Sequence, residues 1–311
     1  MRILLLTLAV TIAQAPPPAS EIYLLTLKAD GDAVRLGEPI NISNNQGYDN
    51  QPCFTPDGRS ILFTSNRSRV VSTPLAGAEP PPSQTDIYRF DIASKQIRQV
   101  TDTLESEYSP TITPDGQGIS VIRVEGDGTQ RLWRFGLDGA APVLVLTDVK
   151  PVGYHAWIDR HRLALFILGD RGQPATLQLA DTRTGQAEVI ATDIGRSIQR
   201  MPSGAISFVQ REAAGEGDAR RLLVRQFDPG AAGEARVSAL VTVPPGISQP
   251  DLAWMPDGSL LLAHDGKLHR WAGAAAGWSV AADLAALGVR GASRLAVSPA
   301  GDWLAIVADG R

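Results

Sequence analysis

Six short segments of this 311-residue sequence place polar, charged or aromatic side chains directly ahead of an apolar run. Such groups could hold a peptide, a protein terminus or a small polar ligand. Their carboxylates could instead bind a hard cation, and an imidazole among them could act as acid or base. The candidate site residues are Tyr48, Asp49, Asn50, Gln51, Glu105, Glu107, Tyr108, Tyr154, His155, Arg196, Gln199 and Arg294. They form one site only if the fold brings these distant segments together.

Other catalytic chemistry finds little support in the sequence. A covalent serine mechanism needs a G-x-S-x-G turn, and the strings that begin at Gly195 and Gly291 lack the final glycine. His155 and His161 fall at opposite ends of one expected strand, about 20 Å apart at ~3.3 Å per residue, so they cannot share a metal. The single cysteine, Cys53, excludes an intramolecular disulfide, and its inward strand position predicts a buried, unreactive thiol.

Turn chemistry indicates which elements would position the candidate residues. Three Pro-Asp-Gly turns, at residues 56–58, 114–116 and 256–258, are each followed by alternating apolar residues. Proline presets φ, aspartate caps the turn and glycine accepts a positive φ, so each turn joins two strands tightly. Weaker forms of the same frame at Asp159, Ser203 and Ala300 bring the number of units to six. The shorter spacings match the ~40–45 residues of a four-stranded propeller blade, and the longer ones contain insertions.

A second hairpin completes each unit, with strands such as residues 87–91. After the sixth turn, however, the sequence stops at Arg311, before the outer two strands. Ile22–Leu25 and residues 39–43 resemble these missing third and fourth strands. We therefore predict an all-β fold, a six-bladed β-propeller of four-stranded antiparallel blades. N-terminal strands complete the C-terminal blade and close the ring, which removes exposed sheet edges.

The Pro-Asp-Gly hairpins, together with the Ile-Tyr-x-x-Asp strand at residues 87–91, resemble the TolB-like β-propeller family over essentially residues 20–308. TolB carries an extra α/β domain before its propeller, whereas here the repeats begin close to the start of the sequence. TolB docks to a peptidoglycan-associated lipoprotein in the periplasm. The resemblance therefore implies a protein or peptide as the kind of partner.

The N-terminal residues and the composition predict where the chain works. Residues 1–15 combine Arg2, an apolar run and small residues at the expected cleavage positions, which predicts a signal peptide and a periplasmic or extracellular location. That run is too short to cross a ~30 Å membrane core, so we expect no membrane span. Residues 16–311 are expected to form a single propeller domain and a monomer. The 29 basic and 33 acidic residues lack a basic cluster, which argues against a nucleic-acid partner.

The innermost strand of each propeller blade follows the central channel, so the candidate residues should ring one mouth of it. The leading hypothesis is a non-catalytic binding or scaffold protein that uses this mouth and needs no cofactor. The competing hypothesis is a metal-assisted hydrolase or lyase. In that case Asp49, Asn50, Glu105 and Glu107 would ligate Ca²⁺ or a similar cation, with His155 as acid or base. Alternatively, the polar groups only cap the channel through water-mediated hydrogen bonds.

The order of the blades also predicts charge pairs at this mouth. The sixth blade adjoins the first, so Asp49 and Arg294 should form the closer pair. Glu105, Glu107 and Arg196 should then remain available to a ligand. The loops at residues 67–84 and 211–219 would open on the same face, where they could form a rim or be tolerated insertions.

Overall fold

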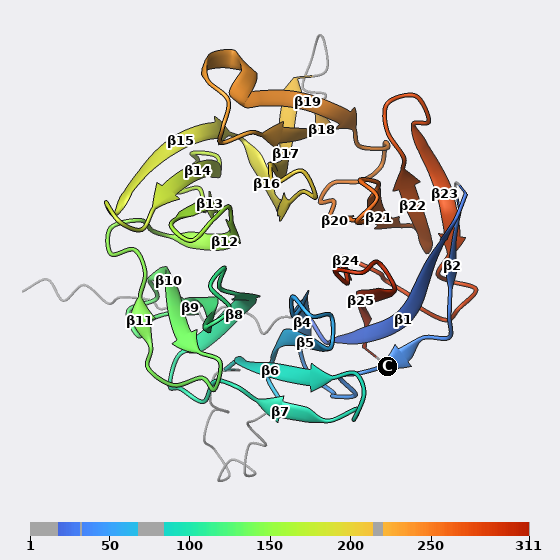
Figure 1. The fold of residues 1–311 in the computed structure, drawn as a ribbon, viewed down its shortest axis with the longest axis horizontal. Coiled ribbons are helices and arrows are strands. Elements are labelled where there is room, and N and C mark those ends of the chain that lie inside the picture. Colours follow the sequence, from blue (N-terminus) through green and yellow to red (C-terminus); the bar gives the residue numbers. More distant parts are fainter. Residues whose placement is uncertain (1–17, 32, 68–83, 214–219, 311) are drawn as a thin grey trace, which may run out of the picture.

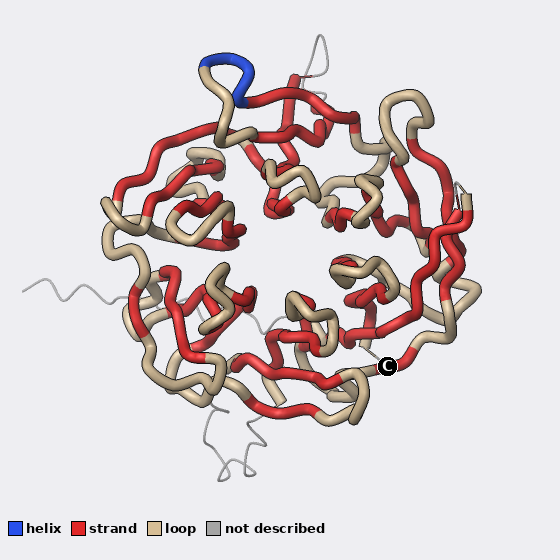
Figure 2. The backbone as a smooth tube through the Cα atoms, in the orientation of Figure 1, coloured by secondary structure: helices blue, strands red, loops and turns tan. Residues whose placement is uncertain are grey.

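The computed structural model describes residues 18–31, 33–67, 84–213 and 220–310, and these form six antiparallel sheets arranged in a ring (Figure 1). The predicted all-β fold of six four-stranded blades is confirmed. Nearly all regular structure is strand, with one short 3₁₀ turn, η1 (Gly233–Arg236), in the described chain (Figure 2). No helix in the described residues has the length and hydrophobicity needed to cross a membrane. The predicted signal peptide lies outside these residues.

Each of the first five blades consists of four strands that are consecutive in the sequence. Blade one contains β4 (Asp49–Phe54), β5 (Ser60–Ser65), β6 (Asp86–Asp91) and β7 (Ile97–Gln99). Blade two contains β8 (Ser106–Ile112), β9 (Gly118–Val124), β10 (Gln130–Gly136) and β11 (Val143–Leu144). Blade three contains β12 (Val152–Trp157), β13 (Arg162–Ile167), β14 (Thr176–Asp181) and β15 (Gln186–Thr192). Blade four contains β16 (Ile194–Arg200), β17 (Ile206–Ala213), β18 (Arg220–Phe227) and β19 (Val237–Thr242), and blade five contains β20 (Leu252–Trp254), β21 (Leu260–His264), β22 (Lys267–Trp271) and β23 (Trp278–Asp283).

Blade six combines both ends of the chain, as predicted. Its inner strands are β24 (Arg294–Val297) and β25 (Trp303–Asp309), and its outer strands are β1 (Ser20–Asp30), β2 (Ala33–Leu36) and β3 (Ile40–Asn41). β1 pairs with β25 from Ser20 opposite Asp309 to Thr26 opposite Trp303. β3 then pairs with the first half of β1, whereas β2 pairs with its second half. The ring is therefore closed by backbone hydrogen bonds between the N- and C-terminal strands.

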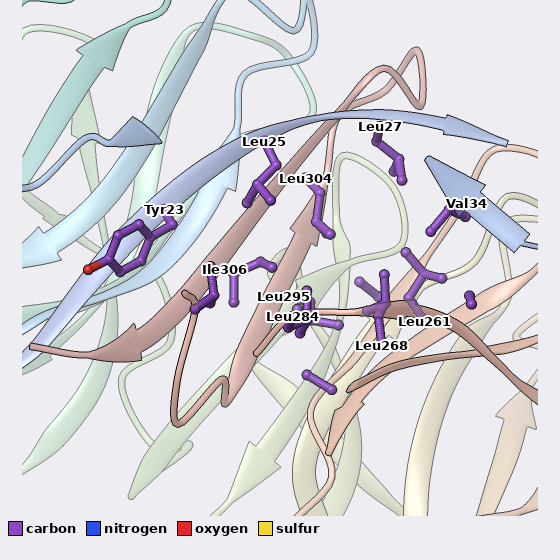
Figure 3. Packing of buried hydrophobic residues seen from close by; sticks show 14 of the residues in the cluster. Tyr23, Leu25, Leu27, Val34, Leu261, Leu268, Leu284, Leu295, Leu304 and Ile306 are labelled. Atoms are coloured by element: carbon purple, nitrogen blue, oxygen red, sulfur yellow. The ribbon is translucent and has the colours of Figure 1, made fainter. Parts of the chain in front are cut away.

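The β1–β2 hairpin also ties blade six to blade five. Val34 of β2 belongs to the buried cluster that contains Leu268 of β22, and Figure 3 shows both side chains among those of β1 and β25. Arg270 of β22 donates a hydrogen bond from Nη1 to the carbonyl oxygen of Gly31, at 2.6 Å. Apolar side chains thus fill the space between adjacent blades, where their burial supplies most of the stability.

The Pro-Asp-Gly turns adopt the conformation that their sequence predicts. Asp57 accepts hydrogen bonds from the Thr55 hydroxyl at 2.6 Å and from the Arg59 amide at 3.1 Å. Gly58 has a φ of +68°, in the left-handed region that favours glycine. These turns fix where the inner strands of blades one, two and five end and their second strands begin.

Candidate functional site

The inner strands of the six blades, β4, β8, β12, β16, β20 and β24, lie nearest the centre (Figure 1). A channel of about 650 Å³ runs between them and is lined by side chains from all six. We call the end where these strands begin the channel mouth. Each blade contributes one residue that lies just before its inner strand or within the first three residues of that strand. In blade order these are Tyr48, Tyr108, Tyr154, Arg196, Asp251 and Arg294.

Two arginines share one carboxylate at the channel mouth. Nη2 of Arg196 lies 2.6 Å from Oδ2 of Asp251, and Nη1 of Arg294 lies 3.8 Å from Oδ1 of the same carboxylate. The Asp251 side chain is only 7% exposed, whereas that of Arg196 is 33% exposed. Nε of Arg196 is buried and makes no hydrogen bond within the described residues. The trio therefore carries an excess positive charge and an unsatisfied donor, which suit an anionic ligand.

Tyrosines complete the channel mouth around Arg294. Its Nη2 donates to the hydroxyl of Tyr154 at 2.6 Å, and its guanidinium carbon lies 4.9 Å from the centre of that ring. Burial raises the pKa of Tyr48 to about 12, although the nearby charge of Arg294 acts in the opposite direction. The phenol of Tyr48 therefore stays neutral and can donate a hydrogen bond. The rings of Tyr48 and Tyr108 meet edge to face, with centroids 6.5 Å apart.

The prediction that Asp49 and Arg294 form the closer ion pair is wrong. Asp49 is fully buried and forms its ion pair with Arg67, whose Nη2 lies 2.7 Å from Oδ1. Asp49 stands opposite Ser65 in the β4–β5 ladder, so a residue just after β5 is its nearest cationic neighbour. Arg294 pairs with Asp251 of blade five instead, which was not among the candidate residues.

Glu107 is not available to a ligand, contrary to the prediction. It is fully buried, lies 3.1 Å from Nε of Arg123, and accepts hydrogen bonds from the hydroxyls of Thr101 and Thr103. Burial raises the pKa of Glu107 to about 7, even though Thr103 and Arg123 favour the charged form. Glu105 remains one-third exposed, 3.9 Å from the Arg123 guanidinium.

Three of the four oxygen ligands suggested for a cation lie beside arginines instead: Asp49 beside Arg67, and Glu105 and Glu107 beside Arg123. Asn50 uses its side-chain oxygen to accept a hydrogen bond from the amide of Gln51, at 2.8 Å. Across the described part of the chain, no group of three or more histidine, cysteine or acidic residues is arranged to hold a metal ion. Each of the two ion pairs lies within one blade: Asp49 and Arg67 belong to blade one, and Glu107 and Arg123 belong to blade two.

Gln51 and His155 line the channel but are occupied by contacts between blades. The side-chain oxygen of Gln51 accepts hydrogen bonds from Thr64 in its own blade and from the amide of Ser109 in blade two, both at 2.8 Å. His155 is buried, with Nε2 2.7 Å from the hydroxyl of Ser120 in blade two. Burial lowers the pKa of His155 to about 3, so the ring is neutral.

Ser120 and His155 do not form a nucleophile and base open to a substrate. The Ser120 side chain is fully buried and also accepts a hydrogen bond from Nε1 of Trp157, at 2.9 Å. Cys53 is half-buried at the channel wall rather than fully buried, and burial raises the pKa of its thiol to about 11. Gln199 lines the channel below Arg196. The predicted rim loops fall largely on residues 68–83 and 214–219, which lie outside the described chain.

Six antiparallel blades around a central channel define this protein as a six-bladed β-propeller. The Tol-Pal system protein TolB of Francisella tularensis is 28% identical to it over 95 residues, which are 30% of this chain and 18% of that protein. The chain is therefore TolB-like in its fold and in part of its sequence. No protein-family model matches it.

Solved structures show the same architecture. The structure of a putative TolB from Agrobacterium tumefaciens superimposes with a TM-score of 0.61 at 15% identity, covering 94% of this chain and 99% of that one. An oligogalacturonate lyase from Vibrio parahaemolyticus superimposes with a TM-score of 0.50 at 14% identity, covering 92% and 97%. At such identities the likeness establishes the fold alone, because propellers carry both binding and catalytic sites.

Proposed function

We propose that this protein is an exported, non-catalytic binding protein that holds a protein, a peptide or a small polar ligand at the channel mouth. One observation carries the proposal: Arg196 and Arg294 share the single carboxylate of Asp251 at the channel mouth. The channel mouth thus has cationic donors to offer, whereas the acids Asp49 and Glu107 are committed to Arg67 and Arg123. The TolB-like fold and the signal-peptide sequence support a periplasmic role.

The competing function, metal-assisted hydrolysis or elimination, draws on the likeness to the Vibrio lyase, which concerns the fold. It would require the acids of blades one and two to leave their arginine partners and approach one another. Addition of Ca²⁺ after treatment with a chelator distinguishes the two functions. A rise in melting temperature of the mature chain would favour the metal-assisted function.

Affinity capture from a periplasmic extract tests the binding function. The mature chain is compared with Arg196→Gln, which removes a cation from the channel mouth while leaving Arg294 to pair with Asp251. Arg183→Gln is the matched control, because Arg183 is paired with Asp181 in the exposed turn after β14. We expect Arg196→Gln to lose specific captured molecules that Arg183→Gln retains. Identical captured sets from all three proteins, or captured molecules that have been cleaved, would contradict the proposal.

A further inference from the structure

A second hollow opens beside the channel mouth, between blades three and four, with a volume of about 370 Å³. We call it the side pocket. Its walls are mainly apolar, from Phe166, Leu168, Ala175, Ile194, Val209 and Leu222, and Arg211, which pairs with Asp193, and residues 248–250 complete the lining. It shares two residues with the channel, Tyr154 and Arg196. The channel mouth and the side pocket are therefore adjoining parts of one concave surface.

The shape of the side pocket follows from the packing of the two blades. The Tyr154 ring meets Phe166 edge to face, with centroids 5.7 Å apart, so one wall is aromatic. At Gly195 the strand has no side chain, and a Cβ there would lie 3.5 Å from the side chain of Val209, an ordinary contact distance. The absence of a side chain at Gly195 thus leaves open a space that a larger residue could occupy.

Arg196 brings a charged subsite and an apolar subsite together. Its Nη2 contacts Asp251, while its buried Nε has no partner within the described chain. Arg294 supplies a second cation beside the same carboxylate. A ligand carboxylate at this point would balance the excess charge and satisfy the donor. An apolar group attached within a bond or two of that carboxylate would lie at the entrance of the side pocket.

We infer that the channel mouth binds the C-terminus of a peptide chain whose last residue is apolar. The α-carboxylate lies against Arg196 and Arg294, and the last side chain enters the side pocket. A C-terminal residue fits because its carboxylate and its side chain branch from one Cα, whereas in an aspartate or glutamate side chain no apolar group accompanies the carboxylate. This inference rests on the proposed function, since it names the ligand class of the same site.

Labelled peptides test the inference by fluorescence anisotropy with the mature chain. The probes are five-residue peptides of glycine and serine that end in leucine, phenylalanine, valine or serine, each as free acid and as C-terminal amide. We expect the acids with apolar ends to bind. Amidation, or serine at the end, should weaken binding about tenfold or more, the loss that follows from one charge-assisted hydrogen bond or one buried side chain.

Two variants separate the subsites. Arg196→Gln should weaken binding of the free-acid peptides and abolish the difference in affinity between acid and amide. Arg183→Gln should change neither the affinity nor this difference. Gly195→Val, which places a side chain in the side pocket, should weaken the leucine and phenylalanine peptides while the acid remains preferred over the amide. If a variant does not fold, the comparison of acid with amide on the unaltered chain still decides the question.

Any of the following results would overturn the inference. Equal binding of the free acid and the amide would show that the terminal carboxylate is not recognised. Equal binding of peptides ending in leucine and in serine would show that the side pocket does not hold the last side chain. Displacement of the peptides by sodium hexanoate at the same concentration as by unlabelled leucine peptide would assign the site to small carboxylic acids. If no peptide binds but capture still depends on Arg196, the inference fails and the binding function stands. If capture is also independent of Arg196, both fail.

Discussion

The neutral, buried state of His155 makes the stability of the propeller depend on pH. Burial lowers the pKa of His155 to about 3 from the ordinary 6.5, and the side chain is 7% exposed. Below pH 6.5 the unfolded chain binds a proton at this histidine, while the folded chain does not. The free energy of unfolding should therefore fall as the pH falls from 6.5 towards 3. Each pH unit within this window costs about 1.4 kcal/mol, or roughly 2–3 kcal/mol between pH 6.5 and 4.5.

His155→Gln isolates this contribution, because glutamine keeps a polar group towards the Ser120 hydroxyl but does not titrate. Urea unfolding at pH 6.5, 5.5 and 4.5, followed by tryptophan fluorescence, gives the free energy of unfolding of both proteins. We expect the difference, wild type minus variant, to decrease by about 2 kcal/mol or more across this range. His161→Gln is the control, since His161 lies exposed in the turn after the same strand.

Parallel pH profiles for wild type and His155→Gln would refute this reasoning. They would mean that His155 gains a proton without loss of stability, and so that it is hydrated or faces an anion in solution. If the free energy of unfolding of His161→Gln depends on pH as steeply as that of wild type, a general effect of losing a histidine is excluded. If both variants show a weaker pH dependence than wild type, the effect cannot be assigned to the buried ring of His155.

Further predictions concern ring closure, a buried acid and an interblade hydrogen bond. Removal of residues 20–45 should abolish cooperative urea unfolding. Leu25→Ala, at a fully buried position of β1, should cost about 2–5 kcal/mol, while Thr26→Ala, at an exposed position of the same strand, should cost little; equal stability of the two point variants would show that β1 is dispensable. Because burial raises the pKa of Glu107 to about 7 from 4.5, its stabilising proton is lost as the pH rises through this window. The stability of wild type relative to Glu107→Gln should therefore fall between pH 4.5 and 7 in the same urea assay, and a constant difference would contradict it. Trp157→Phe, which removes the 2.9 Å bond to Ser120, should lower the free energy of unfolding by about 1 kcal/mol, and an unchanged value would show that the bond adds nothing.

The architecture could be predicted from the sequence because its signals are local. Each Pro-Asp-Gly turn carries its own capping aspartate and its own glycine at positive φ, so the hairpins are specified within a few residues. Period-two alternation then marks the strands, and the repeat of these hairpins gives the number of blades. Ring closure could be predicted as well, because Ile22–Leu25 has the sequence pattern of a third strand. In the structure this segment pairs with β25, the second strand of blade six, as a third strand does.

The directions of the site side chains could not be predicted in the same way. The inner strands β4, β8, β12 and β16 all contain irregularities where the register shifts, for example between Tyr108 and Thr111. Gln51 and Ser109 adopt positive φ at two of them. A bulge resets the alternation of side chains between the two faces of a strand. Which candidates face the channel and which turn between blades is therefore decided by backbone geometry.

What the sequence alone determined is thus the ring, its closure and the segments that reach the channel mouth. The tertiary structure decided which charges meet there: Asp49 turns to Arg67, and Arg294 turns to Asp251. Ion pairs form over a few ångströms between residues on different strands or blades, so they depend on side-chain direction and blade register together. Neither is encoded in the spacing of residues along the chain, and only the assembled propeller brings Arg196, Asp251 and Arg294 into one site.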